Sequence, residues 1–142
     1  MSGIEKIEWD PKYSVDIEEI DTHQKKMFEL FNQLIDVKES TTETKAYINM
    51  IAEINEYSKL YFSTEEKILK KGGYPDFQTH SKTHRQFTKS FISLRREISE
   101  DIENLSYDVI RELRNWLIDH ILTFDSCYVP FLRINKYIED SK

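Results

Sequence analysis

The chain of 142 residues has little cysteine, glycine or proline, and each shortage excludes a class of protein. Its single cysteine, Cys127, cannot form an intramolecular disulfide and indicates a reducing compartment, so we expect a cytoplasmic protein. Three glycines and three prolines are too few for a β-barrel or sandwich, which turns about every ten residues. No apolar run approaches the roughly 18 residues of a membrane span, and the charged start lacks the apolar segment of a secretory signal.

Basic residues are also outnumbered. Twenty lysines and arginines stand against 26 aspartates and glutamates, which gives a net charge of −6. An acidic chain is poorly suited to nucleic acid or to an anionic membrane surface, so we expect neither as a partner. Hydrophobic residues make up 39% and aromatic residues 13% of the chain, which is enough for the core of one domain.

Apolar residues recur at helical spacing in four segments, which predict helices over residues 16–37, 43–70, 76–100 and 106–138. The break ESTTET (39–44) offers threonines as N-caps, KKGGYP (70–75) has a glycine C-cap followed by proline, and Pro130 predicts a kink or early end. We therefore predict a single domain (1–142), an all-α antiparallel up-down-up-down four-helix bundle (16–138) with an N-terminal arm (1–15). The predicted core residues are Ile20, Met27, Phe28, Leu30, Phe31, Leu34, Ile35, Tyr47, Ile51, Ile54, Phe62, Leu69, Phe77, Phe87, Phe91, Leu94, Ile98, Val109, Leu113, Trp116, Leu117 and Phe124.

Several polar residues fall on the apolar faces of these helices. His80 and His84 lie one turn apart, a spacing at which two imidazoles can hold one metal, although hydrogen-bonded core histidines would have the same spacing. Glu65 and His120 are in phase with the cores of the second and fourth helices, and a buried carboxylate without a partner is costly. Three imidazoles together with carboxylates suit iron, manganese or zinc.

Three nearby residues are harder to place from helix phase. Asp125 follows His120 by five residues, about 140° around an ideal helix, and reaches the same centre only where the helix is distorted or the side chain leans inward. Tyr61, one turn before Glu65, faces inward as a core aromatic. Glu66 points toward solvent and is predicted to be a surface charge. Phase alone leaves Asp125 open between a surface acid and a metal ligand.

Six blocks of residues, spread over residues 9–132, are distinctive in their order along the chain and in the spacing within each block. They are Trp9…Tyr13-Ser-Val, Ile20-Asp21, Phe28…Asn32-Gln-Leu, Tyr57…Phe62-Ser-Thr-Glu65-Glu66, Tyr74-Pro75…His80…His84…Phe87 and Trp116-Leu117…His120-Ile121…Asp125…Tyr128. In the order of these blocks and in the spacing within them, the chain resembles the bacteriohemerythrins of the hemerythrin family. Hemerythrins are four-helix bundles that hold two non-haem irons and bind O2 reversibly. The resemblance implies iron as cofactor, and O2 or another small diatomic molecule as ligand.

The resemblance also implies a set of metal ligands. One iron of the family takes three histidines, which match His80, His84 and His120, and two carboxylates that bridge the irons match Glu65 and Asp125. All five residues are present. The first metal site is therefore expected to be intact, and the five-residue step to Asp125 is a feature of the family.

The second iron of the family takes two histidines that this chain lacks. The family's first-helix run is Ile-Asp-x-x-His; here Gln24 occupies the position of the ligand histidine, and His23 stands one residue before it. The family's second-helix run is His-Phe-x-x-Glu; here Tyr61 occupies the position of the ligand histidine. Gln24 lies about 40° to one side of the apolar face and His23 about 60° to the other, so phase excludes neither. Gln24 offers a weak neutral oxygen, and Tyr61 needs a strong Lewis acid to lose its proton.

We therefore predict a hemerythrin-like non-haem iron-binding protein that is not an enzyme, with an intact first site and an altered second site, where the family binds O2. Three alternatives stay open. In the first, two irons bind through His23 or Tyr61 in an O2 carrier, store or sensor. In the second, which is favoured over the first, the protein is a sensing or interaction module without reversible O2 binding. It would hold one iron or another divalent metal, or little metal. The third, a redox enzyme for peroxide or NO, has least support; a homo-oligomer through the aromatic arm also stays open.

Overall fold

A computed structural model describes residues 4–141 of the protein, so residues 1–3 of the predicted arm and Lys142 lie outside the described residues. The helices in chain order are η1 (Pro11–Tyr13), α1 (Glu18–Ser40), α2 (Thr44–Gly72), α3 (Phe77–Glu100), η2 (Ile102–Asn104), α4 (Tyr107–His120), η3 (Ile121–Asp125) and α5 (Ser126–Asp140). Residues 4–141 contain no strand. Within the same range, no helix is long and apolar enough to cross a membrane.

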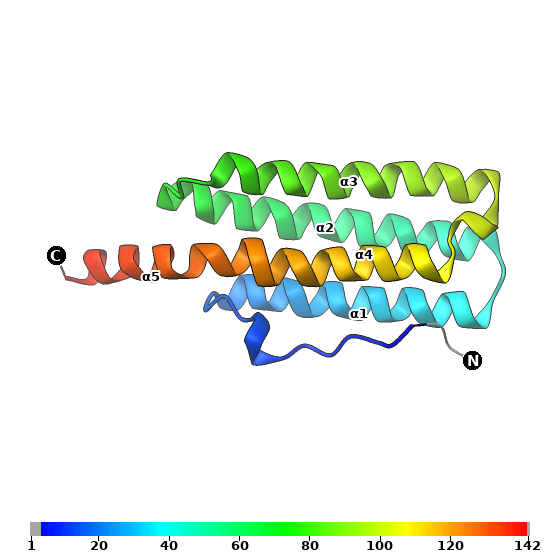
Figure 1. Cartoon of the computed structure of the whole chain (residues 1–142), viewed down its shortest axis with the longest axis horizontal. Helices are drawn as coiled ribbons and strands as arrows, with labels where there is room; N and C mark the ends of the chain where they lie inside the picture. The colour runs from blue at the N-terminus through cyan, green and yellow to red at the C-terminus, as the bar shows by residue number, and fades with distance from the viewer. Residues whose placement is uncertain (1–3, 142) are drawn as a thin grey trace.

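The long helices lie side by side and alternate in direction, as Figure 1 shows. The fourth of these rods consists of α4, η3 and α5 in direct succession, and α5 projects beyond the other helices (Figure 1). The most extensive contacts join α2 to α3 and α1 to α2. The prediction of an all-α antiparallel four-helix bundle is therefore confirmed, with α1, α2 and α3 ending within a few residues of the predicted bounds.

Local chemistry explains where α2 begins and ends. Gly73 closes the helix in the left-handed region, at φ 72°, and its N–H donates to the carbonyl oxygens of Leu69 and Lys70, as the glycine C-cap predicted. The predicted threonine N-cap is wrong. Thr41 instead ends α1 in extended backbone, and its hydroxyl accepts a hydrogen bond from the N–H of Glu43, the N-cap residue, at 3.1 Å.

The core is formed by the apolar stripes of the helices, and most residues predicted to face inward are buried. The exceptions are Phe77, Val109, Leu113 and Trp116, which are half-buried, and Phe124, which is 37% exposed. The prediction for Phe124 is wrong because this residue lies in the π-helical turn η3, where the neighbouring Asp125 takes the inward position.

The segment before α1 lies along that helix (Figure 1). The Ile7 N–H donates to Asn32 Oδ1 and Asn32 Nδ2 donates to the Ile7 carbonyl oxygen, both at 2.8 Å. Nearer the helix, Asp21 accepts from the Ser14 hydroxyl at 2.5 Å and from the Val15 N–H at 2.9 Å. These four hydrogen bonds hold the described part of the arm on α1 at two separate points.

The last rod is interrupted where the site is built. η3 is a π-helical turn between α4 and α5, and a π turn inserts one extra residue, so residues five apart stand above one another. The predicted early end at Pro130 is wrong, because α5 continues through this residue to Asp140. The helical irregularity instead precedes Pro130, in the turn that ends with Asp125.

Candidate metal centre

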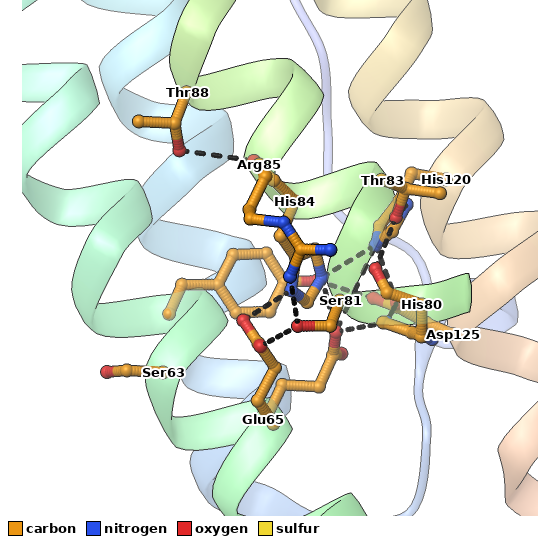
Figure 2. Close-up of polar contacts among 12 residues, drawn as sticks. Ser63, Glu65, His80, Ser81, Thr83, His84, Arg85, Thr88, His120 and Asp125 are labelled. Carbon is orange, nitrogen blue, oxygen red and sulfur yellow. Dashed lines mark hydrogen bonds and ion pairs between the residues drawn. The ribbon is translucent and has the colours of Figure 1, made fainter. Parts of the chain in front are cut away.

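Five titratable side chains from three helical rods meet in the middle of the bundle. Glu65 comes from α2, His80 and His84 from α3, and His120 and Asp125 from the two ends of the π-helical turn. One ligand atom from each lies within 4.8 Å of all the others, and all five residues are at most 3% exposed. Figure 2 shows these side chains converging on one point.

Helix geometry accounts for the convergence. His80 and His84 project from the same stripe of α3, one turn apart, as their spacing predicted. His120 ends α4 and Asp125 ends η3, so the π turn brings residues five apart onto one side. The local distortion that Asp125 needed to reach the centre is therefore present, and Asp125 is fully buried.

The distances within the cluster are those of direct polar contact. Glu65 Oε1 lies 2.6 Å from His80 Nε2 and 3.0 Å from His84 Nε2. Asp125 Oδ1 lies 3.1 Å from Nε2 of both His80 and His120, and the Nε2 atoms of His84 and His120 are 3.1 Å apart. Asp125 Oδ1 is nevertheless buried without a well-formed hydrogen bond. The atoms that face one another are thus the ones that bind metals in proteins, three imidazole nitrogens and two carboxylate oxygens.

The charges of the cluster stabilise one another. Burial acts to raise the pKa of Glu65, but hydrogen bonds from the three histidines outweigh it and hold that pKa well below its usual range. Burial acts to lower the pKa values of His80 and His120, but the two carboxylates raise both to about 9. In the absence of a metal, protons on these imidazoles therefore balance the buried carboxylates, and a bound cation would replace them.

Glu66 is not the surface charge that helix phase predicted. Its side chain is 26% exposed, and Oε2 accepts a hydrogen bond from His84 Nδ1 at 3.0 Å. The Ser81 hydroxyl donates to its other oxygen, Oε1. Glu66 follows Glu65 by one residue, about 100° around the helix, and this direction points its side chain at α3 rather than at solvent.

Two tyrosines hold the outer oxygens of the carboxylates. The Tyr61 hydroxyl donates to Asp125 Oδ2 at 2.5 Å, and the Tyr128 hydroxyl donates to Glu65 Oε2 at 2.8 Å. Burial, followed by the nearby carboxylates, raises both tyrosine pKa values well above their usual range. Both phenols are therefore protonated donors, and the role of Tyr128 was not predicted from the sequence.

The other two residues singled out for the second site are hydrogen-bonded to residues that do not belong to the cluster. Gln24 is fully buried, but its Oε1 accepts from the Trp9 indole N–H at 2.9 Å, and its Nε2 has no partner. His23 is half-buried, and its Nδ1 lies 2.7 Å from the Tyr57 hydroxyl. The structure therefore brings Tyr61 against the cluster and leaves Gln24 and His23 bonded to other residues.

An antiparallel four-helix bundle with a buried centre of imidazoles and carboxylates defines a class of helical metal-binding proteins. Residues 15–132 match the family described as "Hemerythrin HHE cation binding domain". The chain belongs to the hemerythrin family. This membership confirms both the resemblance seen in the sequence and the expectation of a non-enzymatic protein.

Individual relatives cover most of the chain. The bacteriohemerythrin of Clostridium acetobutylicum is 28% identical over 125 residues, which are 85% of this chain and 97% of that protein. The myohemerythrin of Theromyzon tessulatum is 26% identical over 124 residues, 87% of this chain and 92% of that protein. A crystal structure of wild-type hemerythrin has the same fold, with a TM-score of 0.80, 24% identity, and coverage of 87% of this chain and 95% of that one.

Proposed function

We propose that the protein is a cytoplasmic hemerythrin-family member that holds a single non-haem iron and serves as a sensing or binding module without reversible O2 binding. The proposed ligands are His80, His84, His120, Glu65 and Asp125. Family membership favours iron, and the donor set would also accept another divalent metal.

The residues present fit one metal ion. Their ligand atoms already face a common point, and hydrogen bonds from the three histidines hold the pKa of Glu65 well below its usual range. Asp125 Oδ1 is a buried carboxylate oxygen without a well-formed hydrogen bond, which is costly unless a cation lies beside it. His84 and His120 each bond an outer oxygen through Nδ1, from Glu66 and Thr83 respectively, which leaves Nε2 to face the centre.

One observation carries the proposal of a single metal: at both second-site positions, the oxygen that would have to replace the missing imidazole is already hydrogen-bonded to another residue. The oxygen of Gln24 accepts from Trp9, and its amide nitrogen has no lone pair to give a metal. The Tyr61 hydroxyl keeps its proton on Asp125 Oδ2, an oxygen that a second ion would need. His23 is bonded to Tyr57 through Nδ1, and it does not belong to the cluster of ligand atoms. Tyr128 also donates to a carboxylate of the cluster, but it belongs to the pattern shared with bacteriohemerythrins. It therefore does not distinguish this chain from its family, whereas Tyr61 does.

A bound iron would supply a one-electron couple and Lewis acidity. Around it, Tyr61 and Tyr128 hold protons at their hydroxyls and orient the two carboxylates. Since O2 takes up two electrons in the two-iron centres of the family, a chain with one ion has half of that supply. Loss of reversible O2 binding follows from this shortage, and a sensing or binding role needs only the one site.

Exposure of reduced, iron-loaded protein to O2 tests the proposal. We expect no visible absorption change that disappears when the O2 is removed under argon. Metal-free protein serves as the control, because it corrects for scattering and for oxidation of Cys127. A reversible O2-dependent band would support the alternative of an O2 carrier or store.

A further inference from the structure

We propose that Glu66 is a positioning residue for the metal site: its carboxylate fixes the ring of His84 so that Nε2 faces the metal. This inference rests on the proposed function and adds a residue that is not among the five ligands. It starts from the contact between Glu66 Oε2 and His84 Nδ1, at 3.0 Å. A carboxylate can only accept here, so the proton of the neutral imidazole lies on Nδ1 and the lone pair lies on Nε2.

The ring of His84 is constrained in two independent ways. Phe62 stacks on it with ring centroids 4.0 Å apart and an interplanar angle of 6°, which fixes the plane of the imidazole. Stacking alone leaves the ring free to turn over within that plane. The hydrogen bond to Glu66 removes this freedom, because only one orientation places Nδ1 against Oε2. Together the two contacts define where Nε2 points.

Glu66 is itself held in place. The Ser81 hydroxyl donates to Oε1, and Arg85 donates to the Ser81 oxygen at 3.2 Å. Ser81, His84 and Arg85 all belong to α3, so Glu66 connects α2 to one turn of α3 at two points. Figure 2 shows Ser81 and Arg85 beside His84.

The site of Glu66 also suits a retained charge. Its carboxylate lines a cavity of about 370 Å³ between α2 and α3 together with Lys59, Arg85 and Lys89. The side chain is therefore neither fully desolvated nor far from positive charge. An ionised carboxylate makes shorter and stronger hydrogen bonds than a neutral acceptor, which favours it as the partner of a metal-bound imidazole.

His120 has a different outer partner. Its Nδ1 lies 3.3 Å from the Thr83 hydroxyl, which donates its own proton to the His80 carbonyl oxygen. Its ring is stacked between Trp116, at 4.7 Å, and Phe124, at 5.4 Å. A hydroxyl at this distance is a weaker partner than an ionised carboxylate, so aromatic stacking does more of the positioning at His120 than at His84.

The test is the affinity of Co²⁺ for the full chain, measured by competition with a chromophoric chelator. Glu66→Ala should weaken Co²⁺ binding by about 10- to 100-fold, the usual effect of losing an outer partner of a metal-bound histidine. Glu66→Gln should bind within about threefold of wild type, because its amide oxygen can accept from His84 and its NH2 can donate to Ser81. Glu53→Ala, at an exposed position of the same helix, is the matched control and should bind as wild type does.

A second readout separates positioning from a general loss of stability. In Zn²⁺-loaded protein, the Nδ1 proton of His84 should give a resolved NMR resonance in wild type and Glu66→Gln, and should exchange too fast to observe in Glu66→Ala. If Glu66→Ala does not fold, Ser81→Ala, which releases Glu66 from α3, should show a smaller loss of Co²⁺ affinity in the same direction.

The outcomes distinguish the two proposals. Unchanged Co²⁺ affinity in Glu66→Ala, with binding abolished in His84→Ala, would overturn the role of Glu66 and leave the metal site standing. Glu66→Gln as weak as Glu66→Ala would show that charge matters rather than ring position. Wild-type protein that binds no Co²⁺ would overturn both the proposed function and the role of Glu66.

Discussion

The two halves of the buried centre are built on the same bundle but differ in the partners of their polar atoms. In the first half, the imidazole Nε2 atoms and one oxygen of each carboxylate face one another. In the second half, Gln24, Tyr61 and His23 are hydrogen-bonded to Trp9, Asp125 and Tyr57. The comparison teaches that, within one bundle, some buried polar side chains can turn their free atoms toward one another while their neighbours bond to other residues.

The largest expected effect comes from breaking the first half. His84→Ala should reduce bound iron to near zero, because it removes one of three imidazole ligands and leaves two buried carboxylates less compensated. His23→Ala is the matched control in the second half and should leave the iron content unchanged. Metal analysis after gel filtration measures both. Equal iron in wild type and His84→Ala would show that this cluster does not hold the metal.

Rebuilding the second half should have the next largest effect. The triple variant Gln24→His, Tyr61→His and His23→Gln restores the residue order of the family and removes the hydroxyl that occupies Asp125 Oδ2. We expect its iron content to rise from one to two per chain, and reduced protein to gain a reversible O2-dependent absorption. A second iron without any O2 response would place the defect in the surrounding pocket instead.

Removal of the metal should lower stability. A ligand that binds only the folded state adds about 3–4 kcal/mol at a hundred- to thousandfold excess over its dissociation constant. For a chain of this size, that corresponds to a fall of roughly 10 °C in the melting temperature after chelation. Circular dichroism melts with and without chelator measure the shift. Identical melts would mean that the apolar stripes alone carry the bundle.

The size of that shift should depend on pH. In metal-free protein, the pKa values of His80 and His120 are raised from the usual 6.5 to about 9. Their contribution to the stability of the metal-free protein is therefore fully present below about pH 6.5 and is lost as the pH rises through 9. Metal binding needs neutral imidazoles and therefore strengthens over the same range. The melting temperatures of metal-loaded and metal-free protein should accordingly differ more at pH 9 than at pH 6.5. A difference that shrinks with rising pH would contradict this account.

Much of this comparison was predictable from the sequence, since it depends on helix phase. Apolar spacing located the long helices, Gly73 marked the end of α2, and the spacing of His80 and His84 placed both on one stripe. The position of Asp125 followed only on condition of a helix distortion. No residue between His120 and Asp125 predicts a π turn from the sequence, so only the structure shows that the helix is distorted there.

The rest depended on contacts between helices, which phase does not give. Glu66 was assigned to solvent because its angle was known but its neighbour on α3 was not. In the same way, nothing local shows that the Gln24 oxygen is taken by Trp9 or that the Tyr61 hydroxyl reaches Asp125, 64 positions along the chain. Under the proposed function, these are the contacts that limit the centre to one metal.

The number of iron ions per chain tests the central claim most directly. Anaerobic titration with Fe²⁺, followed by gel filtration, metal analysis and a visible spectrum after oxidation, measures this number and the identity of the ligands together. We predict one iron per chain and no absorption from an iron-bound phenolate, because Tyr61 keeps its proton. Two irons per chain, with the second lost in His23→Ala or Tyr61→Phe, would contradict the account.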